Sequence, residues 1–196
     1  MWVLLPAMLL LGMPMDWLLR GEVRFGQVDQ MFLRGRKREL SGWNAAMLVL
    51  DPVRAAVGAG LLAQGAKIAA VHLGGSFPDA TAPLILGIGM FVSMVAQLYT
   101  GRDPEYLLAP VGYAAGLIIS LVAPSVAAIA LLISFATLAG TRAWSGFFFA
   151  GAIACAGVGF LLMELDPVTP AVLGAVLFLP AIAGMLMGRH LMMPGR

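Results

Sequence analysis

Charged residues are scarce in this sequence. Of its 196 residues, 12 are lysine or arginine and 10 are aspartate or glutamate, so 11% are charged while 61% are hydrophobic. A soluble domain carries about 25% charged residues, spread over its whole surface. Nine of the charged residues here fall within Arg20–Asn44, which leaves few for the rest of the chain. The scarcity of charge therefore excludes a soluble globular fold and predicts an integral membrane protein.

Cysteine and histidine are nearly absent too. The single cysteine, Cys155, excludes an internal disulfide and a CxxC motif, and two histidines, His72 and His190, exclude a multi-histidine metal cage. A glycine-rich phosphate loop, HExxH and GxSxG are all missing. The sequence therefore predicts no catalytic residue, no metal and no cofactor. The net charge of +2 gives no reason to expect a nucleic-acid partner.

What the sequence does contain is a series of long apolar stretches. A hydrocarbon core of about 30 Å needs roughly 20 mostly apolar residues per helix. Seven stretches are candidates, and they predict a single all-α domain over residues 1–196, a polytopic transmembrane helical bundle with about seven spans. The predicted spans are Met1–Leu19, Ala45–His72, Thr81–Thr100, Tyr106–Val122, Pro124–Gly140, Ser145–Met163 and Pro167–Gly188.

The basic residues predict the orientation. Cytoplasmic connectors carry an excess of lysine and arginine. With seven spans, Arg20–Asn44 and the arginines at 102, 142, 189 and 196 fall on one side, whereas the opposite connectors carry no basic residue. We therefore expect the N-terminus outside and the C-terminus in the cytoplasm. The first stretch lacks the basic n-region of a signal peptide, and the compact chain suggests a prokaryotic inner membrane.

The segment from residue 20 to residue 44 is predicted to be a basic cytoplasmic loop. Phe25, Val28 and Phe32 have the i, i+3, i+7 spacing of an amphipathic helix lying in the membrane surface. The following basic residues would contact anionic lipid headgroups at about 1 kcal/mol each; a docking site for a cytoplasmic partner is the alternative. These residues are Arg34, Arg36, Lys37 and Arg38.

The second span contains the most informative polar residues. Its six strongly apolar residues favour insertion by roughly 2–4 kcal/mol, and one lysine near the centre opposes it by about 2.5–3.5 kcal/mol. Lys67 and Gln64 would therefore need a protein environment. They are predicted to line a polar pathway with Glu164 or Asp16. The alternatives for Lys67 are an ion pair with Glu164 or Asp166, or a side chain that reaches the outer headgroups.

Three Asp-Pro pairs, at residues 51–52, 103–104 and 166–167, are predicted to open helices, because aspartate caps a first turn and proline needs no partner there. Arg54 would then reach cytoplasmic headgroups or pair with Asp16. Cys155 is expected to be buried. Several residues are predicted to form interhelical hydrogen bonds. These are Ser93, Gln97, Ser120, Ser134 and Thr137.

Three functions fit these patterns. The first is a non-enzymatic accessory or scaffold subunit of a membrane assembly, favoured by short connectors, abundant small residues and the lack of a soluble region that could hold a substrate. The second is a small transporter or channel that uses Lys67 and Gln64. The third is an intramembrane lipid-modifying enzyme with cytoplasmic-face residues. Those residues would be Asp51, Arg54, Arg102, Asp103 and Glu105.

Overall fold

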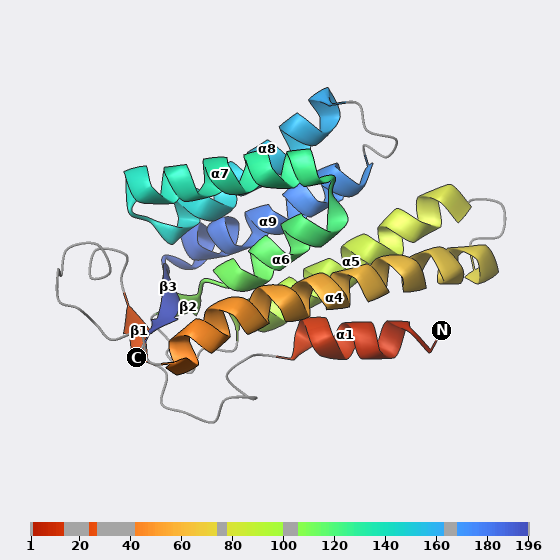
Figure 1. The fold of residues 1–196 in the computed structure, drawn as a ribbon, viewed down its shortest axis with the longest axis horizontal. Helices are drawn as coiled ribbons and strands as arrows, with labels where there is room; N and C mark the ends of the chain where they lie inside the picture. Colours follow the sequence, from red (N-terminus) through yellow and green to blue (C-terminus); the bar gives the residue numbers. More distant parts are fainter. Residues whose placement is uncertain are drawn as a thin grey trace.

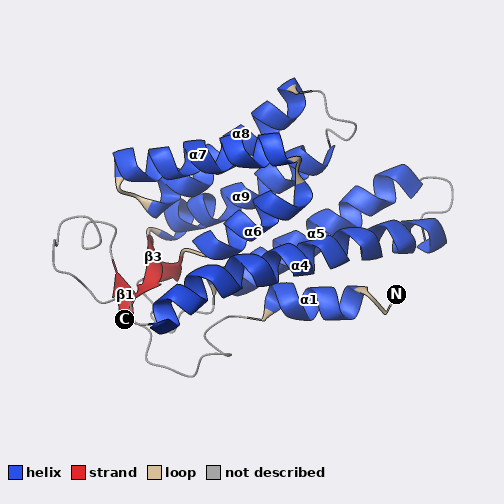
Figure 2. Ribbon diagram, in the orientation of Figure 1, coloured by secondary structure: helices blue, strands red, loops and turns tan. Residues whose placement is uncertain are grey.

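The computed structural model describes residues 2–13, 24–26, 42–73, 78–99, 106–162 and 168–195. This part of the chain consists of seven α-helices and three short strands (Figure 2), which confirms the prediction of a helical protein. The helices are α1 (Leu4–Gly12), α4 (Gly42–Leu73), α5 (Pro78–Leu98), α6 (Val111–Leu121), α7 (Pro124–Thr141), α8 (Trp144–Leu161) and α9 (Val168–Met187).

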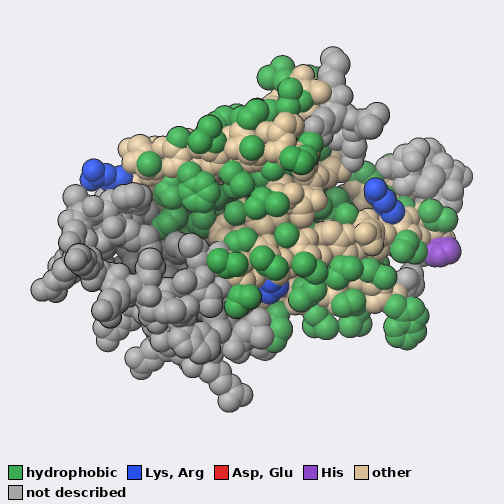
Figure 3. Space-filling model, in the orientation of Figure 1, with side chains coloured by type: hydrophobic (Ala, Val, Ile, Leu, Met, Phe, Trp, Pro, Cys, Tyr) green, Lys and Arg blue, Asp and Glu red, His purple; other side chains and the backbone are tan. Residues whose placement is uncertain are grey.

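Four of these helices, α5, α7, α8 and α9, are long and apolar enough to cross a membrane. Each lies within a few residues of a predicted span. Hydrophobic side chains cover much of the helical surface in the view of Figure 3, where charged side chains are sparse. These features make the chain an integral membrane protein. With nine and eleven residues, α1 and α6 are about 13 and 16 Å long, well short of a hydrocarbon core.

The fourth predicted span begins too early. Tyr106–Leu108 form strand β2, and α6 starts at Val111, directly after Pro110. A proline disfavours helical backbone in the residue before it, so Ala109 separates the strand from the helix. The other end agrees with the sequence, since Ala123 is extended and Pro124 opens α7.

The prediction that Asp51-Pro52 opens a helix is wrong. Helix α4 begins at Gly42 and continues through Pro52 to Leu73. Proline within a membrane helix is tolerated when neighbouring groups compensate for the lost backbone hydrogen bond. Asp51 therefore lies inside the helix, where its carboxylate binds the side chain of Arg54. The pairs at 103–104 and 166–167 lie outside the described residues.

A three-stranded sheet joins distant parts of the chain at one end of the bundle (Figure 1). The C-terminal strand β3 (His190–Gly195) lies in the middle, antiparallel to β1 (Arg24–Gly26) and parallel to β2. Arg24 is paired with Gly195, and Tyr106 with His190. The start of the basic loop, the connector before α6 and the C-terminal tail therefore lie together.

This sheet corrects part of the prediction for the basic loop. Phe25, which was expected on an in-plane helix, lies in β1 and is paired with Pro194 of β3. Backbone pairing with the C-terminal tail competes with the helix that the residue spacing alone favours. Val28, Phe32 and the basic residues 34–38 lie outside the described residues.

The helices form two groups (Figure 1), which are joined by α6 and by direct contact between α5 and α9. Helices α1, α4 and α5 make one group, α7, α8 and α9 make the other, and α6 crosses obliquely between them. The contact of α6 with α4 is very close: a Cβ added to Gly116 would lie 2.7 Å from Cβ of Ala55 and would collide with the carbonyl oxygen of Pro52. The core around this crossing includes Tyr113 and Phe148, and Cys155 is buried as predicted.

Candidate functional site

The described interior contains one concentrated group of polar side chains, at the C-terminal end of α1. Arg54 of α4 is 9% exposed and points at this end. Its Nη1 donates hydrogen bonds to the carbonyl oxygens of Leu10, at 3.0 Å, and Met13, and its Nη2 donates to Oδ1 of Asp51 at 2.6 Å. The prediction that Arg54 extends to cytoplasmic headgroups is therefore wrong.

A second helix completes the contact with α1. Gln97 of α5 is 3% exposed, and its Nε2 donates to the carbonyl oxygens of Leu11 at 2.9 Å and Met13 at 3.3 Å. We call Asp51, Arg54 and Gln97 the α1 clamp. The clamp joins the end of α1 to both α4 and α5.

The physical reason for the clamp lies in the unpaired groups of a helix end. The last four carbonyl groups of a helix lack intrahelical partners, and the aligned peptide dipoles make this end negative. Because α1 ends among packed helices, water is a poor substitute for these partners. A guanidinium group supplies several donors and a positive charge at once. The clamp therefore satisfies carbonyl groups that would otherwise destabilise the bundle.

Next to the clamp, Ser93 of α5 and Tyr113 of α6 share a hydrogen bond between their hydroxyl groups. Both side chains are fully buried, and Tyr113 lies within electrostatic range of Arg54 and Asp51. Ser93 also donates to the carbonyl oxygen of Met90 at 2.9 Å. The hydroxyl pair thus links α6 to α5, one of the two helices that hold α1.

The predicted interhelical hydrogen bonds are confirmed for Ser93 and Gln97. The prediction is wrong for two other serines, since Ser134 donates to Ala130 and Ser120 donates to Leu117 within their own helices. A serine hydroxyl inside a helix can always reach a carbonyl oxygen three or four residues earlier, and this local partner competes with a neighbouring helix.

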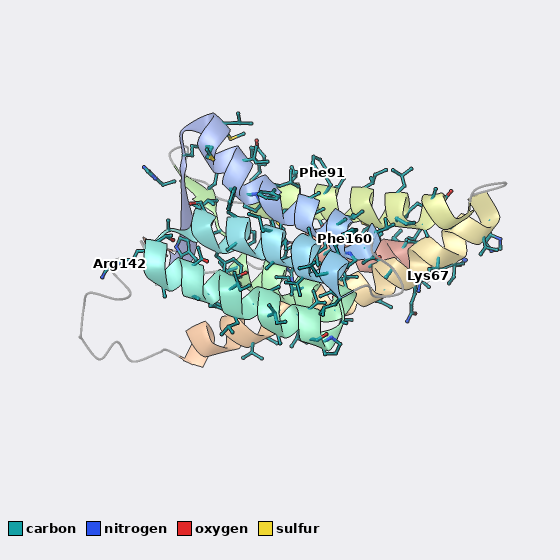
Figure 4. The ribbon with its side chains drawn as sticks, turned by 90° about the horizontal axis from the view of Figure 1, so that it is seen from above. Lys67, Phe91, Arg142 and Phe160 are labelled. Carbon is teal, nitrogen blue, oxygen red and sulfur yellow. The ribbon has the colours of Figure 1, made fainter. Side chains whose placement is uncertain are left out.

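The residues predicted to line a pathway are not assembled in the described structure. Gln64 and Lys67 are exposed on α4, and Lys67 points away from the helices (Figure 4). Asp16 and Glu164 lie outside the described residues, as do Asp166 and the proposed headgroup-binding residues 34–38. The role of Lys67 and Gln64 in a pathway stays a prediction.

Of the residues proposed for a lipid-modifying enzyme, the described part contains Asp51 and Arg54, and these bind each other. Tyr113 was missed by the sequence analysis because a tyrosine among apolar residues resembles ordinary core. The Asp51–Arg54 pair had a detectable signal, since side chains three residues apart meet on one helix face. Two buried nitrogens in the described part, Nε of Arg54 and Nε1 of Trp144, have no hydrogen-bond partner.

Metal binding has no support in this part of the chain. No group of three or more histidine, cysteine, aspartate or glutamate side chains in the described ranges is placed to hold a metal ion. Comparison of the chain with protein-family models, curated proteins and solved structures finds no match. The apolar helices and the polar residues described above are therefore the features from which a function can be proposed.

Proposed function

We propose that this integral membrane protein is a non-enzymatic subunit of a larger membrane assembly. The observation that carries the proposal is how its polar groups are distributed. The interior groups of the α1 clamp bind one another and backbone carbonyls, whereas Gln64 and Lys67 face outward from α4. A protein that exposes an amide and an ammonium group on one helix, while its clamp side chains already have partners, is suited to binding a neighbour through that helix.

The composition of α4 supports this proposal. Helix α4 has 32 residues, yet it is not among the four helices apolar enough to be candidate spans. Lipid tails do not satisfy an amide or an ammonium group, so exposed polar residues in a bundle are favoured where another protein covers them. The other two functions gain no comparable support, because the described clamp residues have no free catalytic group and the described pathway residues face outward.

A photo-crosslinking experiment in native membranes tests the subunit proposal. A photoreactive amino acid at Gln64 is expected to give an adduct with a different polypeptide, and that polypeptide should co-purify with the chain in mild detergent. The matched control is the same amino acid at Leu132, a 71% exposed residue of the apolar helix α7. Adducts of lipid alone at both positions would contradict the proposal.

We also infer the orientation given by the basic residues, with the N-terminus outside and the sheet and C-terminal tail in the cytoplasm, in an inner membrane of a prokaryote. The direct pairing of Arg24 with Gly195 supports a common side for the basic loop and the tail. In this orientation, residues 34–38 would meet anionic headgroups of the cytoplasmic leaflet.

Reporter fusions measure this orientation. A reporter that is active in the cytoplasm alone should be active when fused after Arg38 and also when fused after Arg196. A reporter that is active outside the membrane alone should be inactive at both positions. Opposite results at the two positions would mean that the chain crosses the membrane an odd number of times between Arg38 and Arg196, contrary to the pairing of β1 with β3.

A further inference from the structure

An exposed stripe runs along one side of α4. Its residues are three, four or seven positions apart, as one face of a helix requires. The apolar members Val53, Val57, Ile68 and Val71 are between 43% and 75% exposed, and Gln64 and Lys67 are exposed among them. We call these six residues the α4 stripe. Within the described residues, Lys67 forms no hydrogen bond or ion pair.

The depth of Lys67 follows from the packing of α4 against α5. A Cβ added to Gly89 of α5 would lie 2.8 Å from a methyl carbon of Leu62, so these two positions are level. The two helices run in opposite directions (Figure 1). Five residues further along α4, Lys67 is therefore level with Leu84, which lies inside the apolar candidate span Ala80–Leu98. Lys67 is therefore level with a point four residues, or about 6 Å, inside the end of this apolar segment at Ala80.

The stripe also permits close approach of another helix. Gly60 lies between Val57 and Gln64 on this side of α4, and a Cβ added to Gly60 would meet nothing within 4 Å. Small residues on a membrane helix allow a partner backbone to come near, which strengthens packing and interhelical hydrogen bonds. A cation and an amide close to such a position provide the polar part of a helix–helix contact.

We propose that the α4 stripe binds a transmembrane helix of a different polypeptide, one that carries a carboxylate level with Lys67. The proposal rests on the proposed function and names the chemistry of the partner. Charge complementarity selects the occupant, because a carboxylate neutralises the lysine and accepts its hydrogen bonds. A second copy of this chain is a poor occupant. Copies inserted in the same direction would place one Lys67 opposite another at the same depth, where like charges repel.

The test uses the full chain, labelled with a donor fluorophore and reconstituted in neutral lipid vesicles. The probes are synthetic transmembrane helices of leucine and alanine that carry an acceptor fluorophore. One has a single glutamate at the depth of Lys67, and its matched controls have glutamine or leucine there. Energy transfer should report association that is about 3- to 20-fold stronger for the glutamate helix, the range expected for one polar contact between membrane helices.

Variants of the protein distinguish an effect of the charge at residue 67 on helix binding from an effect on folding. Lys67→Met should reduce binding of the glutamate helix to the level of the leucine helix, and Lys67→Glu should transfer the preference to a probe helix carrying lysine. Leu132→Met on the exposed face of α7 should change neither preference. Since residues 67 and 132 are both exposed, all three variants should keep the melting temperature of the parent protein.

Equal association of all the probe helices would overturn the inference. So would a Lys67→Met variant that still prefers the glutamate helix. A repeat in vesicles that contain anionic phospholipid would also overturn it if Lys67→Met lost bound phospholipid with no change in helix binding. Failure here leaves the subunit proposal standing if Gln64 still crosslinks to another polypeptide in native membranes. Loss of that crosslink would remove the subunit proposal itself.

Discussion

Replacing Arg54 by methionine is expected to lower the free energy of unfolding by about 3–5 kcal/mol, the cost of breaking a buried ion pair by removing one partner. The substitution leaves the Asp51 carboxylate without its cation and takes the donor from the carbonyl oxygens of Leu10 and Met13. The measurement is the unfolding midpoint in a denaturing-detergent titration of the purified protein in mixed micelles.

Lys67→Met is the matched control for this experiment, since it removes one positive charge from the same helix at an exposed position. Its effect should stay within about 0.5 kcal/mol, as for surface substitutions in general. Adding Asp51→Asn to the Arg54→Met variant should restore part of the loss, because no unpaired carboxylate is then buried. If Arg54→Met and Lys67→Met unfold at the same detergent fraction, the α1 clamp does not stabilise the bundle.

The second large effect is expected from Gly116→Ala, a single added methyl group. The new Cβ would collide with the carbonyl oxygen of Pro52 and lie 2.7 Å from Cβ of Ala55, so α4 and α6 would have to separate. Overpacking of this kind destabilises by about 1–3 kcal/mol, and a collision with backbone leaves little room for relief. The same detergent titration should show an earlier midpoint.

Gly157→Ala adds the same methyl group to a helix where a Cβ would meet nothing within 4 Å. It should be neutral or stabilise by up to about 1 kcal/mol, because alanine favours helix over glycine. Closely similar midpoints for the two variants would show that α6 does not depend on close contact with α4. A large loss for Gly157→Ala would instead point to a neighbour that covers this surface of α8.

Both predictions concern the same part of the molecule, where α1 and α6, the two short helices, meet α4. A short helix buries little surface by itself and leaves its ends inside the bundle, so its position depends on specific contacts. Asp51 is involved in the contacts of both short helices. Its Oδ1 binds Arg54, which in turn binds the end of α1. Its Oδ2 would lie 3.0 Å from a Cβ added to Gly112 of α6. Loss of the contacts that hold either short helix should therefore loosen the packing of both α1 and α6 against α4.

The sequence by itself determined that the protein belongs in a membrane and where the four helices long and apolar enough to cross it lie, while the count of seven spans stays a prediction. These properties depend on local composition. A run of about 20 apolar residues becomes a helix in lipid wherever it occurs, and its ends follow from prolines, glycines and charged connectors nearby, as at Pro124 and Gly188. The burial of Cys155 and the tendency of Ser93 and Gln97 to bond to another helix also follow from residue type, whereas their partners, Tyr113 and the end of α1, do not.

Three features were determined by the tertiary structure alone. They are the position of Asp51 inside a helix with Arg54 buried beside it, the short length of α6, and the strand formed by the C-terminal residues. Whether an Asp-Pro pair begins a helix or lies within one depends on what neighbouring helices supply. Arg54 is buried because the end of α1 offers carbonyl oxygens 41 and 44 residues away in sequence. Strand β3 exists because residues 24–26 and 106–108 are brought beside it. Contacts between residues so far apart leave no periodic signal in the sequence, since they arise from packing of already formed helices.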